Sequence, residues 1–201
     1  MLVLGLTGSI GMGKTTTAKI FKQLGVPVHD SDAAVHALMG EGGPAVNIIG
    51  KYFKHTREGN RINRYKLAEE VFSNEHSLAV LENILHPLVR HDCESFIETA
   101  RKAGAKMVLL DIPLLFEKGR HHSVDVTITV TAPANQQRQR VLRRSGMTAA
   151  RFYSIKGRQY SDYDKRQMAD YVIQTGLGLA HTRKIVKDVI DELTLALDNL
   201  P

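Results

Sequence analysis

The chain has 201 residues, of which 43% are hydrophobic and 24% are charged, the ordinary balance of a globular protein. Its single cysteine, Cys93, excludes an internal disulfide and is typical of a reducing compartment. No apolar run is long enough to span a membrane, and the first residues lack the layout of a secretory signal. We therefore expect a soluble cytoplasmic protein with no membrane partner, large enough for one α/β domain with insertions.

The net charge of +6 is compatible with nucleic acid, an acidic membrane surface or small anions as the binding partner. Nine of the 29 residues from Arg138 to Arg166 are Lys or Arg, against 27 in the whole chain. This local concentration favours a local anion as the explanation of the charge.

The first predicted elements are a buried strand at residues 2–6 and a helix at residues 14–24. The segment that joins them fits the phosphate-loop pattern G-x-x-x-x-G-K-[ST], in the strand–turn–helix setting that this pattern requires. Its glycines let backbone N–H groups approach a polyphosphate, and the helix N-terminus adds a positive dipole. Lys14 supplies a charge for the β- and γ-phosphates, and the Thr15 hydroxyl suits Mg²⁺. We predict that ATP is bound by Gly8, Ser9, Ile10, Gly11, Met12, Gly13, Lys14, Thr15 and Thr16.

The pattern of apolar residues predicts four more strands, at residues 26–29, 107–111, 124–130 and 171–174. Helices are expected at residues 33–39, 44–55, 63–72, 76–85, 135–144, 148–159 and 180–197. The pair His86-Pro87 is expected to interrupt or kink the helical pattern before a further helix that reaches residue 103. Residues 57–60 are expected to form a polar turn.

Five short strands alternating with helices predict an α/β protein, with a parallel sheet between two layers of helices. Together with the phosphate loop, this arrangement is the one expected for the three-layer fold of P-loop kinases. About 70 residues separate the second and third strands, far more than a simple crossover needs. We expect one kinase domain over residues 1–201, whose core comprises residues 1–32, 105–135 and 168–201. Residues 33–104 would form an inserted helical subdomain, either for the phosphate acceptor or as a structural decoration, and residues 136–167 an arginine-rich lid.

Phosphoryl transfer requires a carboxylate near the attacking hydroxyl. Asp30 and Asp32 follow the second predicted strand, and either carboxylate could orient the hydroxyl and hold a water ligand of Mg²⁺. The alternative is a structural role, in which Ser31 or Asp32 caps the next helix; the two roles can coexist. Asp111, which ends the apolar strand at residues 107–111, is a competing support for the metal.

Cations for the transferring phosphate are expected from the lid. Arg140 and Arg144 are four residues apart and therefore share one face of the predicted helix. Guanidinium groups bind phosphate oxygens in pairs. The alternative is that these arginines form a solvated basic surface.

Several segments of the chain together resemble the dephospho-CoA kinase family. They are the glycine loop followed by His29-Asp30-Ser31-Asp32, then Leu85-His86-Pro87-Leu88-Val89, Pro113-Leu114-Leu115-Phe116-Glu117 and Asp170-Tyr171-Val172-Ile173. The similarity runs through the chain in order, and the His-Pro and Pro-Leu-Leu-Phe-Glu segments single out this family. Ser9, Met12, His29 and Ser31 depart from the residues common there.

This resemblance implies ATP-dependent phosphorylation of the ribose 3′-hydroxyl of dephospho-CoA, the last step of CoA synthesis. It would make Asp32 the catalytic carboxylate. The loop pattern and the chemistry of transfer add Lys14 and Arg140 as catalytic cations, and Thr15 and, through water, Asp32 as the groups that hold Mg²⁺. The resemblance places His86 and Pro87, together with Asp32, in the binding site of the acceptor. The expected partners are ATP and dephospho-CoA, with no nucleic acid, for a monomer or weak homo-oligomer.

Three other functions fit the sequence less well. A kinase for another hydroxyl, such as that of a nucleoside monophosphate or shikimate, does not explain the long insertion or the His-Pro segment. A GTPase is disfavoured because no Asn-Lys-x-Asp segment occurs. A nucleic-acid-binding protein fits the charge, but no helix-turn-helix, zinc or aromatic RNA-binding signature is present. The histidines also lack the spacing of a zinc site.

Overall fold

The computed structural model describes residues 1–72 and 74–199. The chain divides into two compact units. The first, called the core unit below, comprises Met1–His29 and Ala100–Pro201, and the second, the helical unit, comprises Asp30–Thr99. Among the described residues, no helix has both the length and the apolar character that crossing a membrane requires.

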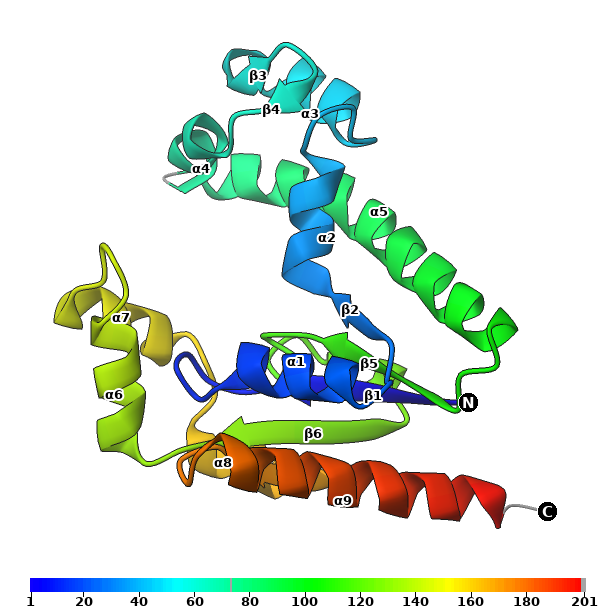
Figure 1. Ribbon diagram of the computed structural model, residues 1–201. Coiled ribbons are helices and arrows are strands. Elements are labelled where there is room, and N and C mark those ends of the chain that lie inside the picture. Colours follow the sequence, from blue (N-terminus) through cyan, green and yellow to red (C-terminus); the bar gives the residue numbers. More distant parts are fainter. Residues whose placement is uncertain (73, 200–201) are drawn as a thin grey trace. The chain divides into compact units, whose positions relative to one another are not determined.

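The core unit is built on a five-stranded sheet with the order β2-β5-β1-β6-β7. The strands β2, β5, β1 and β6 are labelled in Figure 1. The strands of the sheet are β1 (Leu2–Thr7), β2 (Val28–Asp30), β5 (Met107–Asp111), β6 (Val126–Thr131) and β7 (Tyr171–Gln174). The strand β1 is parallel to both β5 and β6, and β6 is parallel to β7. Leu6 is paired with Asp111 on one side and with Ile128 on the other, so the carboxyl ends of three strands meet at one edge.

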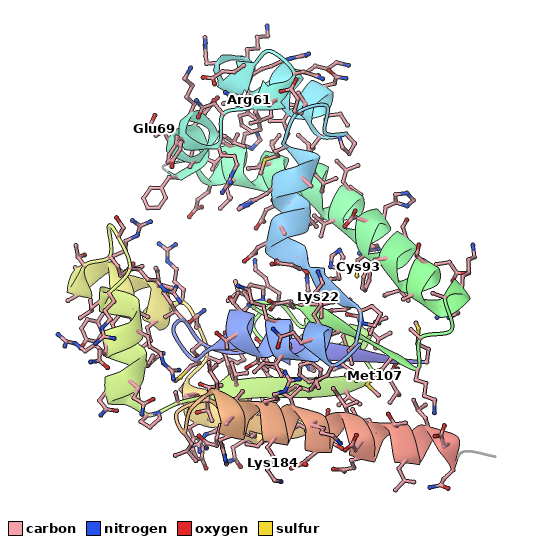
Figure 2. The ribbon with its side chains drawn as sticks, viewed as in Figure 1. Lys22, Arg61, Glu69, Cys93, Met107 and Lys184 are labelled. Atoms are coloured by element: carbon pink, nitrogen blue, oxygen red, sulfur yellow. The ribbon has the colours of Figure 1, made fainter. Side chains whose placement is uncertain are left out.

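Two helices, α1 (Lys14–Gln23) and α9 (Leu179–Asp198), pack against each other and against this sheet. Phe21 of α1 and Val186 of α9 are fully buried and belong to the same apolar cluster as residues of β1, β5, β6 and β7. Met107, labelled in Figure 2, belongs to it at the start of β5. Burial of an aliphatic or aromatic side chain of this size contributes about 1.5–3 kcal/mol, so this cluster fixes α1 on the sheet.

Three short helices connect β6 to β7: α6 (Ala134–Leu142), α7 (Ala149–Gly157) and α8 (Asp162–Met168). The first two match the helices expected there, whereas α8 was not expected as a separate helix. It begins after Ser161, whose hydroxyl accepts a hydrogen bond from Asp164 N, and two acidic residues lie in its first turn. A 3-10 turn, η2 (Arg120–Ser123), lies between β5 and β6.

The helical unit has its own apolar core and contains one short hairpin. Its elements are α2 (Ser31–Leu38), α3 (Val46–Tyr52), η1 (Lys54–Thr56), β3 (Arg57–Glu58), β4 (Arg61–Ile62), α4 (Arg64–Phe72) and most of α5 (Glu75–Lys102). Its core includes Ile49, Phe53 and Leu85. The turn expected at residues 57–60 is part of the hairpin, with Gly59 at a φ of 60°. The interruption expected at His86-Pro87 was wrong, because α5 continues through Pro87.

Candidate active site

The glycine loop lies between the end of β1 and the first turn of α1. Gly11 and Gly13 have φ values of 79° and 97°, in the left-handed region that residues with a Cβ rarely adopt. A Cβ on Gly11 would lie 2.5 Å from Val141 Cγ2, and one on Gly13 would lie 2.9 Å from Thr175 Oγ1. Backbone conformation and close neighbours therefore both require glycine at these two positions.

The first turn of α1 presents unused hydrogen-bond donors. Gly13 is the N-cap residue, no side chain caps it, and the turn contains no acidic residue. Thr15 and Thr16 are exposed there, and Lys14 is the first residue of the helix. Free N–H groups, the positive end of the helix dipole and an ammonium group together form a site for a polyphosphate.

Lys14 contacts the neighbouring strand through an ion pair. Its Nζ is paired with Oδ1 of Asp111, the last residue of β5. The Asp111 side chain is 4% exposed and that of Lys14 is 18% exposed, so water screens this pair weakly. The parallel register of β1 and β5 thus brings a buried carboxylate next to the phosphate loop. Asp111 is therefore a residue of the candidate site, in contact with Lys14.

Three polar side chains from distant segments of the chain contact the backbone of the glycine loop, and no sequence pattern pointed to them. Gln137 of α6 donates from Nε2 to the carbonyl oxygen of Ile10 at 2.8 Å, and Gln159 Oε1 accepts from the Ile10 N–H at 2.9 Å. The Thr175 hydroxyl, just after β7, donates to the carbonyl oxygen of Met12 at 2.6 Å. These residues lie 127 to 163 positions from their partners, so no local motif could indicate them.

The two arginines expected to bind phosphate differ in their surroundings. Arg140 of α6 is partly buried, and its guanidinium donates to the Thr175 hydroxyl at 3.0 Å and to the Thr175 carbonyl at 2.9 Å. Arg144 is exposed just beyond α6. Through Thr175, Arg140 is therefore connected to the phosphate loop, whereas Arg144 lies on the surface of the same unit.

A buried ion pair anchors the segment that returns from α7 to the sheet. Lys165 of α8 and Glu117 are 2.8 Å apart, and their side chains are 1% and 9% exposed. The same Glu117 oxygen accepts the N–H of Tyr160 at 2.9 Å, next to Gln159. In the sequence, Glu117 is part of the Pro-Leu-Leu-Phe-Glu segment, which by itself indicates no partner for this carboxylate. Its contacts show that it fixes the chain from which Gln159 reaches the loop.

We expect Lys165→Met to lower the free energy of unfolding by about 3–5 kcal/mol, because it leaves the Glu117 carboxylate buried without its cation. Chemical denaturation of the purified variant measures this loss. The double variant Lys165→Met with Glu117→Leu should recover most of it, since both charges are then absent. Equal stability of the single variant and the wild type would contradict the assignment of a structural ion pair.

The helical unit contains the other candidate carboxylates. The cap of α2 is Asp30, whose Oδ1 accepts the N–H groups of Asp32 and Ala33 at 3.0 Å each. The expectation that Ser31 or Asp32 would cap this helix was therefore wrong. Asp32 lies in the first turn with an exposed side chain and has no ion pair or side-chain hydrogen bond among the residues described. The capping role thus uses Asp30 and leaves the Asp32 carboxylate unengaged.

His86 and Pro87 lie within α5, and both are exposed. Leu85, immediately before them, is buried in the core of the helical unit. The helix therefore presents the His-Pro pair on its exposed side, where a ligand can reach it.

Over residues 1–72 and 74–199, no group of three or more His, Cys, Asp or Glu residues is arranged to hold a metal ion. A magnesium ion in a kinase site is usually held by one or two protein groups together with substrate phosphates and water. The Thr15 hydroxyl and the Asp111 carboxylate are oxygen groups at the loop that could serve as such ligands.

A glycine loop with these features, at the carboxyl edge of a parallel sheet and at the start of a helix, defines a P-loop nucleotide-binding protein. The chain matches the family model described as dephospho-CoA kinase over residues 2–180. It is 49% identical over 193 residues to a dephospho-CoA kinase of Mesorhizobium japonicum, covering 96% of this chain and 97% of the relative. A dephospho-CoA kinase of Agrobacterium fabrum is 46% identical over 193 residues, with 96% and 98% covered.

The crystal structure of TT1252 from Thermus thermophilus is similar to this structure with a TM-score of 0.81 and 32% identity, over 96% of this chain and 97% of that one. The chain belongs to the dephospho-CoA kinase family. Both the resemblance inferred from the sequence and the predicted P-loop α/β fold are confirmed.

Proposed function

We propose that this chain transfers the γ-phosphate of ATP to the ribose 3′-hydroxyl of dephospho-CoA, giving CoA and ADP. The observation that carries the proposal is the complete phosphate loop, with Lys14 held at it by Asp111, in a chain that matches the family model over residues 2–180. Phosphoryl transfer depends on positioning and charge neutralisation, and this loop supplies both for a triphosphate.

The residue roles follow from the chemistry of each group. The loop amides and Lys14 bind the β- and γ-phosphates, and Thr15 with Asp32 (through water) or Asp111 would hold Mg²⁺. When bound, that ion would supply positive charge to offset that of the phosphates. Asp32 accepts a hydrogen bond from the attacking hydroxyl and orients it, and it is suited to this because Asp30 performs the capping.

The remaining assignments concern the acceptor and the lid. Residues 33–104, with His86 and Pro87 exposed on α5, would bind dephospho-CoA. Residues 136–167 would close over the triphosphate, with Arg140 and Arg144 as phosphate ligands. A cytoplasmic location and a monomeric or weakly associated state stay predictions from the sequence.

The test of the function is a coupled assay of ADP release with purified protein, ATP and Mg²⁺, across several acceptors. Dephospho-CoA should support turnover, and mass spectrometry should show one added phosphate on the product. Shikimate and AMP are the matched acceptors from other P-loop kinases, and they should give rates no higher than the ATP blank. Turnover with AMP and none with dephospho-CoA would overturn the proposal.

ATP should also protect the lid from proteolysis. Arg138, Arg143, Arg151 and Arg158 are exposed, and each is a trypsin site within residues 136–167. Closure over bound ATP would bury them, so cleavage there should slow about tenfold or more in the presence of an ATP analogue that is not hydrolysed. Cleavage at the exposed Arg183 and Lys184 of α9 is the internal control and should not change. Unchanged cleavage within 136–167 would contradict the lid assignment.

A further inference from the structure

Two side chains bind carbonyl oxygens of the phosphate loop, and the side of the loop that they contact is called its outer side below. Gln137 donates to the Ile10 carbonyl at 2.8 Å, and Thr175 donates to the Met12 carbonyl at 2.6 Å. Both side chains are buried, since the residues are 1% and 7% exposed. A hydrogen bond of this kind fixes the direction in which each carbonyl points.

The direction of a carbonyl determines that of the next amide. A peptide group is planar and trans, so its C=O and N–H point in opposite directions. Holding the Ile10 carbonyl toward Gln137 turns the N–H of Gly11 away from Gln137. Holding the Met12 carbonyl toward Thr175 likewise turns the N–H of Gly13 away from Thr175. Neither amide has an acceptor within the part of the chain that the structure describes.

The glycines agree with this geometry. Gly11 and Gly13 are the loop residues with positive φ, and the missing Cβ atoms let α6 and Thr175 approach. A Cβ on Gly11 would lie 3.0 Å from the Gln137 carbonyl oxygen, and one on Gly13 would lie 2.9 Å from Thr175 Oγ1. Gln137 and Thr175 thus lie close to the loop on one side. The unused N–H groups of Gly11 and Gly13 point to the opposite, inner side, where the proposed function places the phosphates.

We propose that Gln137 and Thr175 are positioning residues of the phosphate site: they orient the amides of Gly11 and Gly13 toward the polyphosphate before it binds. This inference rests on the proposed function, and it adds two residues to the machinery outside the glycine motif. The gain is preorganisation, because amides that already point inward need no ordering when the anion arrives.

Thr175 also connects the loop to the lid. Its hydroxyl accepts from Arg140 Nη1 at 3.0 Å, and its carbonyl accepts from Arg140 Nη2 at 2.9 Å. The hydroxyl has two carbonyl acceptors within reach, Met12 at 2.6 Å and Thr131 at 3.2 Å, and the shorter contact assigns its proton to Met12. An accepted hydrogen bond from a cation polarises the hydroxyl and strengthens its donation to Met12. Gln137 contacts Ile10 independently of this chain, so the two residues can be tested separately.

Thr175→Val tests the hydroxyl alone, because valine keeps the shape of threonine, and Arg140 retains its bond to the Thr175 carbonyl. The probe is inorganic tripolyphosphate, which has no base or ribose, titrated by calorimetry in the presence of Mg²⁺. We expect about tenfold weaker binding of tripolyphosphate and of ATP, the size of effect that one lost hydrogen bond produces. Thr175→Ser, which restores the hydroxyl, should bind within about twofold of the wild type.

The matched control is Thr182→Val. Thr182 is 2% exposed, and its hydroxyl also donates to a backbone carbonyl, that of Gly178 at 2.9 Å, outside the loop. The variant Thr182→Val should lower the melting temperature about as much as Thr175→Val does, and it should leave tripolyphosphate binding unchanged. A merely structural role for Thr175 would make the two variants behave alike in both measurements and would overturn the inference.

Gln137→Met tests the second contact, with Gln139→Met, an exposed glutamine of the same helix, as its control. Gln137→Met should raise KM for ATP about tenfold with kcat changed less than about threefold, and Gln139→Met should change neither.

Wild-type affinity for tripolyphosphate in both Thr175→Val and Gln137→Met would overturn the inference and leave the proposed function intact. A loss for ATP without a loss for tripolyphosphate would assign these residues to the nucleoside and overturn it as well. Failure of the wild type to bind ATP would instead overturn the proposed function, and the inference with it.

Discussion

Replacing Lys14 by alanine should lower kcat for dephospho-CoA phosphorylation by about 10³-fold, the range seen when a charge that stabilises a transition state is removed. The ammonium group is fixed at the first residue of α1, beside the amides of the glycine loop. The proposed function places the transferring phosphate beside this ammonium group, and no other residue of the loop carries a positive side chain. The coupled assay at saturating ATP measures this loss.

The ion pair with Asp111 adds a second consequence. Lys14→Ala removes the cation beside a carboxylate that is only 4% exposed, so some stability should be lost together with activity. The melting temperature of the variant must therefore be measured beside its rate. The double variant Lys14→Ala with Asp111→Asn removes both charges and should recover stability but not activity.

Lys19→Ala is the matched control for Lys14→Ala. Lys19 is exposed on the same helix, and its removal changes the net charge of the protein by the same amount. It should keep kcat within about twofold of the wild type, since surface charges away from a site contribute little. If Lys14→Ala retained more than a tenth of the wild-type kcat with a normal melting temperature, its role in transfer would be wrong.

The helix that follows the loop and the strands of the sheet around it could be predicted from the sequence, because each is marked by a local pattern. The strand expected at residues 171–174 is β7, and the one expected at residues 107–111 is β5. The helix expected from residue 14 begins there, immediately after the glycine motif. Apolar runs bounded by glycine or aspartate give these boundaries without any knowledge of the tertiary structure.

The errors arise where a local signal competes with packing. The strands β3 and β4 have two residues each, too few to show an alternating pattern. Pro87 removes one helical hydrogen bond, yet α5 continues through it because Leu85 and Val89, on either side, are buried in the core of the helical unit. Burial of these side chains outweighs the cost of the missing bond, and sequence periodicity does not show which of the two effects prevails.

The glycine motif itself could be predicted, and the residues that support it could not. Gln137, Gln159 and Thr175 reach the loop from segments that are distant in sequence, and each is an ordinary polar residue in its own surroundings. Lys165 looks like one more cation of a basic segment, although it is 1% exposed and paired with Glu117. Contacts between distant segments depend on topology, which single-sequence patterns do not contain.

Asp32→Asn is the second substitution with a large expected effect. We expect kcat to fall by about 10²–10⁴-fold, the usual contribution of a positioned general base. KM for dephospho-CoA should stay within about threefold of the wild type, because the amide keeps the size of the carboxylate and can still contact the acceptor. Steady-state kinetics with dephospho-CoA varied at saturating ATP separate the two parameters.

Asp30→Asn is the control that the structure provides for this experiment. Asp30 caps α2 through its Oδ1, and asparagine caps a helix about as well as aspartate. The variant therefore removes a neighbouring negative charge and keeps the helix end, so kcat should change less than about threefold. Since Asp32 lies in the first turn of α2, its own replacement should cost only about 0.3–1 kcal/mol of stability, too little to explain a large loss of rate.

The pair of variants thus separates three roles for the two carboxylates. A large loss of kcat in Asp32→Asn alone, with an unchanged melting temperature, assigns the chemistry to Asp32. A comparable loss in Asp30→Asn would move the catalytic role to the cap residue, whose carboxylate already accepts two amide hydrogen bonds. An equal loss of kcat and of acceptor affinity in Asp32→Asn would make Asp32 a binding residue, because an interaction made only in the transition state leaves ground-state affinity unchanged.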